Sequence, residues 1–133
     1  MSKEQNCFEI QGTAVKSLGW MIDKLNKCNI SDIENIFCKI ATFLMKCVEI
    51  ESSFTDNKYT ISELEFYYCR DDHEDCYCHS YESYKKGYDH KQKQRLCWYF
   101  HGSGMDITIG DGKNIYGGIL IRSVLENKEL LIS

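Results

Sequence analysis

The sequence predicts an α+β fold in which two helices pack on one face of a curved antiparallel sheet of four or five strands. Two observations support this prediction. Apolar residues recur at helical spacing through the first part of the chain, and short aromatic-rich runs with partial alternation follow from residue 59 onward. The 133 residues suffice for a single domain at 1–133, with a helical part at 1–51 and a β-rich part at 57–133.

The helical part contains two amphipathic segments. A first helix is predicted over residues 13–28, where an apolar stripe recurs three or four residues apart: Val15, Leu18, Met21, Ile22 and Leu25. A second helix is predicted at about 32–49, beginning at a capping box formed by Ser31 and Glu34. Its apolar face is broad, so we expect it to pack on more than one side.

The β-rich part begins with a strand at 59–68 and ends with strands at 96–101, 105–110 and 116–124. Residues 69–95 show no clear period and are predicted to form a long loop, a feature that is often functional. A hairpin turn is predicted at 111–114, and Gly117-Gly118 indicates a bulge or a close approach by another backbone.

Composition excludes several classes of protein. No apolar run reaches the roughly 20 residues of a membrane helix, and residues 1–12 lack the apolar core of a signal peptide, so we expect a cytoplasmic protein without membrane partners. The formal net charge of −4 argues against a generic nucleic-acid-binding surface. Lysines and an arginine cluster in residues 85–95, either as a solvated loop or as a local phosphate contact.

The chain has eight cysteines. Without an export signal, we expect reduced and mostly buried thiols rather than a disulfide framework, with Cys38 and Cys47 as small core residues of the second helix. Five potential zinc ligands crowd the segment that follows the first strand: Cys69, His73, Cys76, Cys78 and His79. No CxxC pair occurs among them and no second ligand pair is present elsewhere, so neither a metal nor a cofactor is expected.

Three carboxylates are candidates for chemistry. Glu63 and Glu65 lie two apart on a predicted strand, which places both on one face. If they were partly buried, their repulsion would raise one pKa and favour a general base that acts on water. The alternative is the solvent face of an amphipathic strand. Asp106 precedes an apolar strand and is either a hydrogen-bonding residue at its entry or a second active-site acid.

The order of four short motifs suggests a family. They are Ile61-x-Glu-x-Glu-x-Tyr67, His79-Ser80 at the end of an acidic stretch, Gly104-Met105 after an aromatic strand, and the apolar run that ends in Arg122-Ser-Val-Leu-Glu126. This order resembles that of the alkyladenine-type 3-methyladenine DNA glycosylases over roughly residues 59–126. The resemblance implies a mixed fold whose antiparallel sheet is partly barrel-like.

The resemblance also implies an activity, the hydrolysis of the N-glycosidic bond of a damaged purine that has been flipped out of DNA. Glu65 matches the glutamate that activates water, and Arg122 matches an arginine that helps to hold the water or the backbone. The expected substrate-binding residues are Tyr67, which matches a base-stacking aromatic, His79, which matches a histidine near the base and sugar, and His101, Asp106 and Glu63.

Two positions differ from the family pattern. Ser103 replaces a tyrosine of the aromatic pocket, and Asp106 stands where the family has a bulky side chain that wedges into the duplex. Three hypotheses follow: a diverged purine N-glycosylase acting on DNA or on a nucleoside or nucleotide, a protein that binds a nucleobase or nucleotide without hydrolysis, and a protein-interaction module. The oligomeric state is not indicated.

Overall fold

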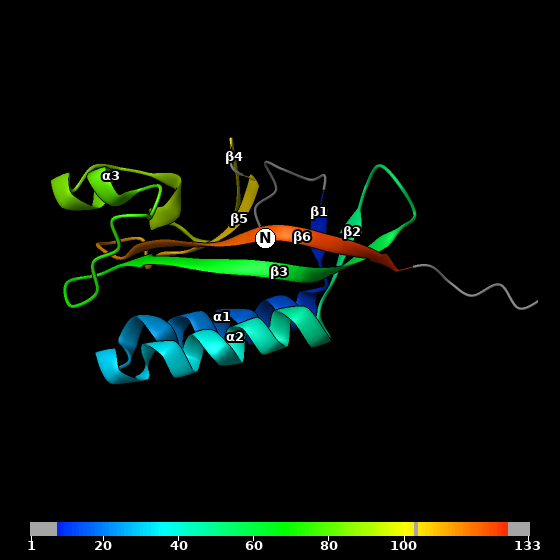
Figure 1. Cartoon of the computed structure of the whole chain (residues 1–133), viewed down its shortest axis with the longest axis horizontal. Helices are drawn as coiled ribbons and strands as arrows, with labels where there is room; N and C mark the ends of the chain where they lie inside the picture. The colour runs from blue at the N-terminus through cyan, green and yellow to red at the C-terminus, as the bar shows by residue number, and fades with distance from the viewer. Residues whose placement is uncertain (1–7, 103, 128–133) are drawn as a thin grey trace, which may run out of the picture.

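Two helices lie side by side and run in opposite directions beneath one face of a sheet (Figure 1). The computed structural model describes residues 8–102 and 104–127. Helix α1 spans Gly12–Lys27 and helix α2 spans Ile33–Cys47, with a 3₁₀ turn at Ile30–Asp32 between them. Both predicted helices are therefore confirmed.

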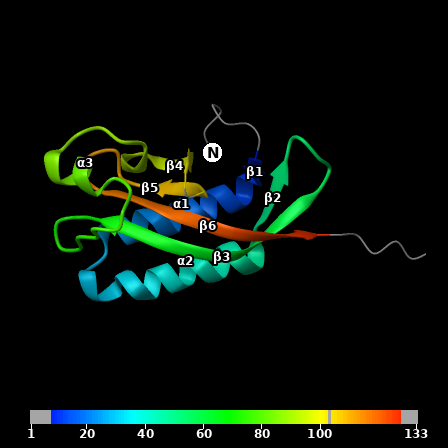
Figure 2. The ribbon, with the colours of Figure 1, turned by 45° about the horizontal axis from the view of Figure 1, so that its top comes forward.

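Within the described residues the sheet contains six antiparallel strands in the order β1-β2-β3-β6-β5-β4 and curls into a half-barrel (Figure 2). The strands are listed here with their bounds: β1 (Phe8–Ile10), β2 (Glu49–Ser52), β3 (Lys58–Cys69), β4 (Arg95–His101), β5 (Gly104–Ile109) and β6 (Tyr116–Asn127). The predicted α+β class and the curved, partly barrel-like antiparallel sheet are confirmed. The count of four or five strands was too low, because β1 and β2 are too short to show a period of two.

The sequence predicted a long loop between β3 and β4, but this segment is partly regular. It contains a short helix, α3 (Tyr81–Lys86), and a 3₁₀ turn at Lys91–Lys93. Gly87 ends α3 in the left-handed conformation with a φ of 71°, which glycine adopts without a steric penalty. This segment lies over the face of the sheet opposite α1 and α2 (Figure 1).

The predicted capping box of α2 is wrong. The N-cap residue is Asp32, the last residue of the 3₁₀ turn, and no side-chain hydrogen bond caps the helix. Because Ser31 lies inside the 3₁₀ turn, one residue before the N-cap, it does not hold the position from which a hydroxyl caps the first turn of α2.

The main core lies between the helices and the sheet. Its largest fully buried side chains come from both layers: Leu18, Ile22 and Leu25 of α1, Ile33, Ile40 and Leu44 of α2, and Ile61, Tyr68, Trp98 and Ile107 of the sheet. The breadth predicted for α2 is met only in part. Phe37 and Phe43 pack against this core, whereas Cys38 and Cys47 are exposed and are not the small core residues that we expected.

Arg70 fixes the start of the β3–β4 segment to the end of α1. Its guanidinium donates to the carbonyls of Leu25 at 3.0 Å and Cys28 at 2.7 Å, and to the carboxylate of Asp72 at 2.6 Å. Tyr68 adds a hydroxyl bond to Asn26 at 2.7 Å. The two bonds from Arg70 to Leu25 and Cys28 satisfy carbonyls at the end of α1, where a helix leaves them without intrahelical partners, so the segment begins from a fixed point.

Of the seven cysteines within the described part of the chain, only Cys69 and Cys78 are buried, and all seven are free thiols. The expectation of mostly buried thiols is therefore wrong, and Cys7 lies outside the described residues. None of the described helices is long and apolar enough to cross a membrane.

Candidate functional site

The predicted site residues gather on the face of the sheet that the two long helices leave uncovered. Leu120 of β6 pairs with Glu65 of β3 on one side and with Asp106 of β5 on the other. Residues opposite one another in adjacent strands point to the same face, so both carboxylates project from this face. Neighbouring strands lie about 4.8 Å apart, which places the two backbones about 10 Å apart.

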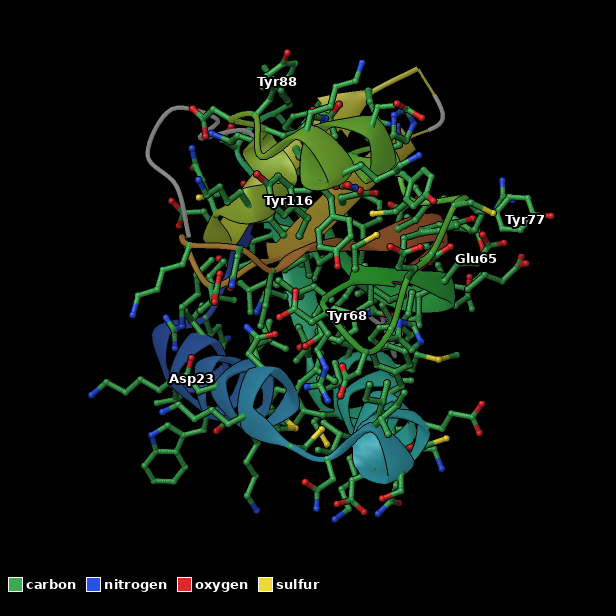
Figure 3. All side chains as sticks on the ribbon, turned by 90° about the vertical axis from the view of Figure 1, so that its left-hand side faces the viewer. Asp23, Glu65, Tyr68, Tyr77, Tyr88 and Tyr116 are labelled. Atoms are coloured by element: carbon green, nitrogen blue, oxygen red, sulfur yellow. The ribbon has the colours of Figure 1, made fainter. Side chains whose placement is uncertain are left out.

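Glu65 is held between two donors. The hydroxyl of Tyr67, two residues along β3, donates to Oε2, and Nε of Arg122 on β6 donates to Oε1 at 2.9 Å. Period-two geometry explains why Glu65 and Tyr67 share a face, and strand pairing explains why Arg122 reaches them. The structure therefore brings together three residues that the sequence had proposed as a group; the end-on view labels Glu65 (Figure 3).

These two donors lower the pKa of Glu65, first through the hydrogen bond from Tyr67 and then through that from Arg122. The same contacts raise the pKa of Tyr67, because its hydroxyl donates to the carboxylate, and raise the pKa of Arg122. Glu65 is thus a stable carboxylate at neutral pH. This differs from the raised pKa considered for a pair of repelling glutamates.

Glu63 has a partner of its own. It accepts a hydrogen bond from the hydroxyl of Ser123 at 2.9 Å, and the register of β3 against β6 shifts on both sides of it. This irregularity moves Glu63 out of the regular alternation that orients Glu65. The two glutamates are therefore held by different residues of β6.

Asp106 is buried, with 1% of its side chain exposed, and both of its oxygens accept hydrogen bonds. Its Oδ1 lies 2.9 Å from Nε2 of His101, and its Oδ2 accepts from the side-chain amide of Gln92 at 2.7 Å. A buried carboxylate with two partners holds their orientation tightly. Asp106 therefore holds the side chains of His101 and Gln92 in place, and its own side chain does not project into solvent.

Gln92 connects this carboxylate to the β3–β4 segment. Its side-chain oxygen accepts from the Ser80 amide at 3.0 Å, the Ser80 hydroxyl at 2.6 Å and the Cys78 thiol at 3.2 Å. The side chain is fully buried, so every one of these bonds is shielded from water. The segment that carries His79 is thereby tied to the sheet through one glutamine.

Two glycines of β6 leave room for these groups. A Cβ atom on Gly118 would meet Oδ2 of Asp106 and lie 2.9 Å from Nε2 of Gln92, and a Cβ on Gly117 would lie 2.6 Å from the Tyr67 carbonyl. The predicted close approach by another backbone is confirmed at Gly117, whereas the groups that come close to Gly118 are side chains, and the register shifts of β6 against β3 lie elsewhere.

Four rings lie next to one another above Asp106. His79 packs on His101 with centroids 4.2 Å apart, and Tyr99 lies 4.9 Å from His101 and 5.4 Å from His90. Tyr99 pairs with Asp106 across β4 and β5, which accounts for its place in the group. Burial lowers the pKa of His90, with the neighbouring His79 a further cause. In this aromatic surface His79 is exposed, Tyr99 and His90 are half-buried, and the side chain of His101 is buried.

A small buried cluster joins the two groups of site residues. Cys69, Cys78 and Tyr116 pack together, and Tyr67 contacts them from the Glu65 side while Cys78 reaches Gln92 on the other. Contact with Cys78, together with burial, raises the pKa of the Cys69 thiol. In the part of the chain that the structure describes, no set of three or more Cys, His, Asp or Glu side chains could hold a metal ion.

Sequence reasoning had proposed Glu65, Tyr67, Arg122, His79, His101 and Asp106, and the structure brings them onto one face in two adjacent groups. It had not identified Gln92, Tyr99 or His90. Tyr99 was detectable, since it lies two residues before His101 on one strand and so shares its face. Gln92 lies in an irregular segment and had no such signal. Ser103 lies outside the described residues.

Comparisons with known proteins give no relative for this arrangement. A scan against protein-family models found no match, and searches of the curated proteins and of the solved structures found none either. The resemblance to the alkyladenine-type glycosylases therefore stays a prediction based on its four short motifs.

Proposed function

We propose that the protein hydrolyses the N-glycosidic bond of a purine nucleoside or nucleotide, as a diverged relative of the alkyladenine-type glycosylases. The observation that carries the proposal is the Glu65 carboxylate, held between Tyr67 and Arg122 with a lowered pKa. Cleavage of a glycosidic bond passes through a cationic, oxocarbenium-like sugar, which a permanent carboxylate stabilises. In the overall reaction the bond between C1′ of the sugar and the base nitrogen breaks. Water supplies a hydroxyl group to C1′ and a proton to the departing base.

The aromatic surface supports the same proposal. His79 and Tyr99 offer ring faces and polar edges on the same face of the sheet as Glu65, and bases bind proteins by stacking on such rings. His79 is exposed, so it is the ring that a base can reach. In this proposal Glu65 orients water and stabilises the sugar cation, Arg122 holds the carboxylate, and Tyr67 and His79 contact the base.

Asp106 favours a substrate other than duplex DNA. The corresponding residue of the family wedges into the duplex, whereas Asp106 is buried and bonded to His101 and Gln92. A flipped base in a duplex needs a side chain to replace it in the stack and a basic surface to hold the backbone. The net charge of −4 points the same way.

Binding without hydrolysis is the second candidate, favoured by one observation. Both oxygens of Glu65 already accept hydrogen bonds, and the lowered pKa makes it a weaker base toward water. A site of this kind would recognise a nucleobase or nucleotide by stacking and charge and leave it intact.

Glu65→Gln distinguishes these candidates, with Glu51→Gln as a matched control, since Glu51 is a half-exposed glutamate of the same sheet that lies outside the site. The substrates are inosine, ethenoadenosine, their monophosphates and short DNA carrying hypoxanthine or ethenoadenine, and the readouts are release of free base and binding. Release that Glu65→Gln abolishes and Glu51→Gln retains would support hydrolysis. Binding without release in the wild type would support the second candidate. If none of these compounds is bound, both proposals are wrong.

A further inference from the structure

On the opposite side of the molecule, α1 carries an exposed tryptophan between two grooves. Trp20 is 80% exposed and lines both of them. The first groove, of about 660 Å³, runs between α1 and α2 and includes Met21, Cys28 and Ile36. The second, of about 730 Å³, runs between α1 and the start of β4 and includes Val15 and Leu96.

Packing of the core does not account for a tryptophan at position 20. The apolar stripe of α1 that faces the sheet consists of Leu18, Ile22 and Leu25, all fully buried. Trp20 instead lies on the outer surface, in line with Lys16 and Lys24 at intervals of four residues along the helix. A large aromatic side chain exposed in this way is typical of a residue that anchors a binding partner.

The charged side chains that line the two grooves indicate what kind of partner would bind there. The two grooves are lined by five basic and two acidic side chains, whereas the chain as a whole has a formal net charge of −4. One of the acidic residues, Asp23, is already paired with Arg95 at 2.8 Å. The remaining basic side chains are Lys16, Lys24, Lys27 and Lys39. The surface is thus a basic region on an acidic protein.

We propose that this surface, the Trp20 surface, binds an acidic peptide segment of another protein, with apolar anchors of that segment in the two grooves. The lysines attract the acidic residues and Trp20 supplies the apolar contact. A peptide suits the grooves better than a lipid surface, because the apolar stripe of α1 is already buried and only Trp20 remains to insert. The proposal does not rest on the proposed hydrolysis, since the Trp20 surface lies on the helical side of the sheet.

A displayed library of random 16-residue peptides, selected on the full chain, tests the proposal. We expect the enriched peptides to be acidic and to contain apolar residues. Binding of synthetic copies should weaken at least about tenfold in Trp20→Ala, the usual loss for an anchoring tryptophan. It should also weaken in Lys24→Glu/Lys27→Glu, and increasing salt should weaken binding to the wild type. Phe54→Ala is the matched control, because Phe54 is 76% exposed in the loop between β2 and β3 and lies outside both grooves.

Four outcomes would overturn the proposal. One is enrichment without acidic character, and another is peptide binding that Trp20→Ala leaves unchanged. A third is a dimer in sedimentation velocity that Trp20→Ala dissociates, which would make a second copy the occupant. The fourth is binding to phosphatidylserine vesicles, but not to acidic peptides, that Trp20→Ala removes. Circular dichroism of each variant checks that the fold is kept, as expected for so exposed a side chain.

Discussion

Gly118 provides the space that the carboxylate of Asp106 occupies. The two residues belong to adjacent strands, and a side chain on Gly118 would meet Oδ2 of Asp106, the atom that accepts from Gln92. The order of the site therefore depends on a position with no side chain at all. Substitution of Gly118 by alanine, which adds one methyl group, tests this dependence.

Gly118→Ala should lower the free energy of unfolding by about 1–3 kcal/mol, the usual cost of forcing extra volume into a packed region. It should also displace Asp106 and so loosen His101 and Gln92. Urea denaturation measures the first effect, and chemical-shift changes of the His101 ring measure the second. Gly12→Ala serves as a control, since a Cβ there meets nothing within 4 Å. Equal stability of the two variants would contradict the assigned role of Gly118.

The lowered pKa of Glu65 predicts a specific titration. In a carbon-detected NMR experiment, the midpoint for its side-chain carboxyl should lie below the ordinary value of 4.5. Because the folded pKa is depressed, the stabilisation is present above the unfolded pKa and is lost as the pH falls through the folded one. Tyr67→Phe should raise the midpoint more than Arg122→Gln, since the Tyr67 hydrogen bond is the larger cause. The opposite order would contradict this description of the site.

Burial raises the pKa of Tyr68 to about 12. Because the folded pKa exceeds the unfolded value of 10, the stabilisation is present below pH 10 and is lost as the pH rises toward 12. Tyr68→Phe removes the bonds to Asn26 and Leu25, which should cost about 1 kcal/mol at pH 7. Urea denaturation between pH 7 and 11 should show this difference shrinking above pH 10. A constant difference would mean that Tyr68 ionises equally well in the folded state.

Arg70→Met should destabilise the protein by about 1–3 kcal/mol, because it removes the guanidinium bond to the Cys28 carbonyl and one of the bonds that the Leu25 carbonyl accepts, leaving those from Tyr68 and Cys28. Arg95→Met is the matched control: its pair with Asp23 is half-exposed, so we expect a loss of about 0.2–1 kcal/mol. Thermal unfolding followed by circular dichroism measures both variants. If the loss in Arg70→Met is no larger than in Arg95→Met, the role of Arg70 at the end of α1 is not supported.

Elements with a long, regular pattern were predictable from the sequence. The helices around Leu18 and Ile40 each present an apolar stripe over four turns, and the strand around Phe66 combines alternation with β-forming residues. Strands β1 and β2 were not predictable, since three or four residues carry no period. Their place depends on pairing with β3, which is a tertiary effect.

The site was predictable only where strand geometry governs it. Glu65 and Tyr67 share a face because they lie two residues apart, and the motif order brought Arg122 into the same group. Gln92 could not be inferred, because its burial depends on how an irregular segment folds over the sheet. For Cys38 and Cys47, the apolar character of a cysteine suggested burial, but their positions around α2 place them on its solvent side.

The position of β6 in the sheet has a consequence for synthesis. Among the described residues it is the last strand in sequence order, yet it lies between β3 and β5 and is hydrogen-bonded to both. Until residues 116–127 have left the ribosome, β1–β3 and β4–β5 have no common neighbour, and Glu65 and Asp106 belong to separate hairpin-like pieces. The site therefore cannot assemble before β6 has been synthesised, and a nascent chain exposes the unpaired edges of β3 and β5 until then.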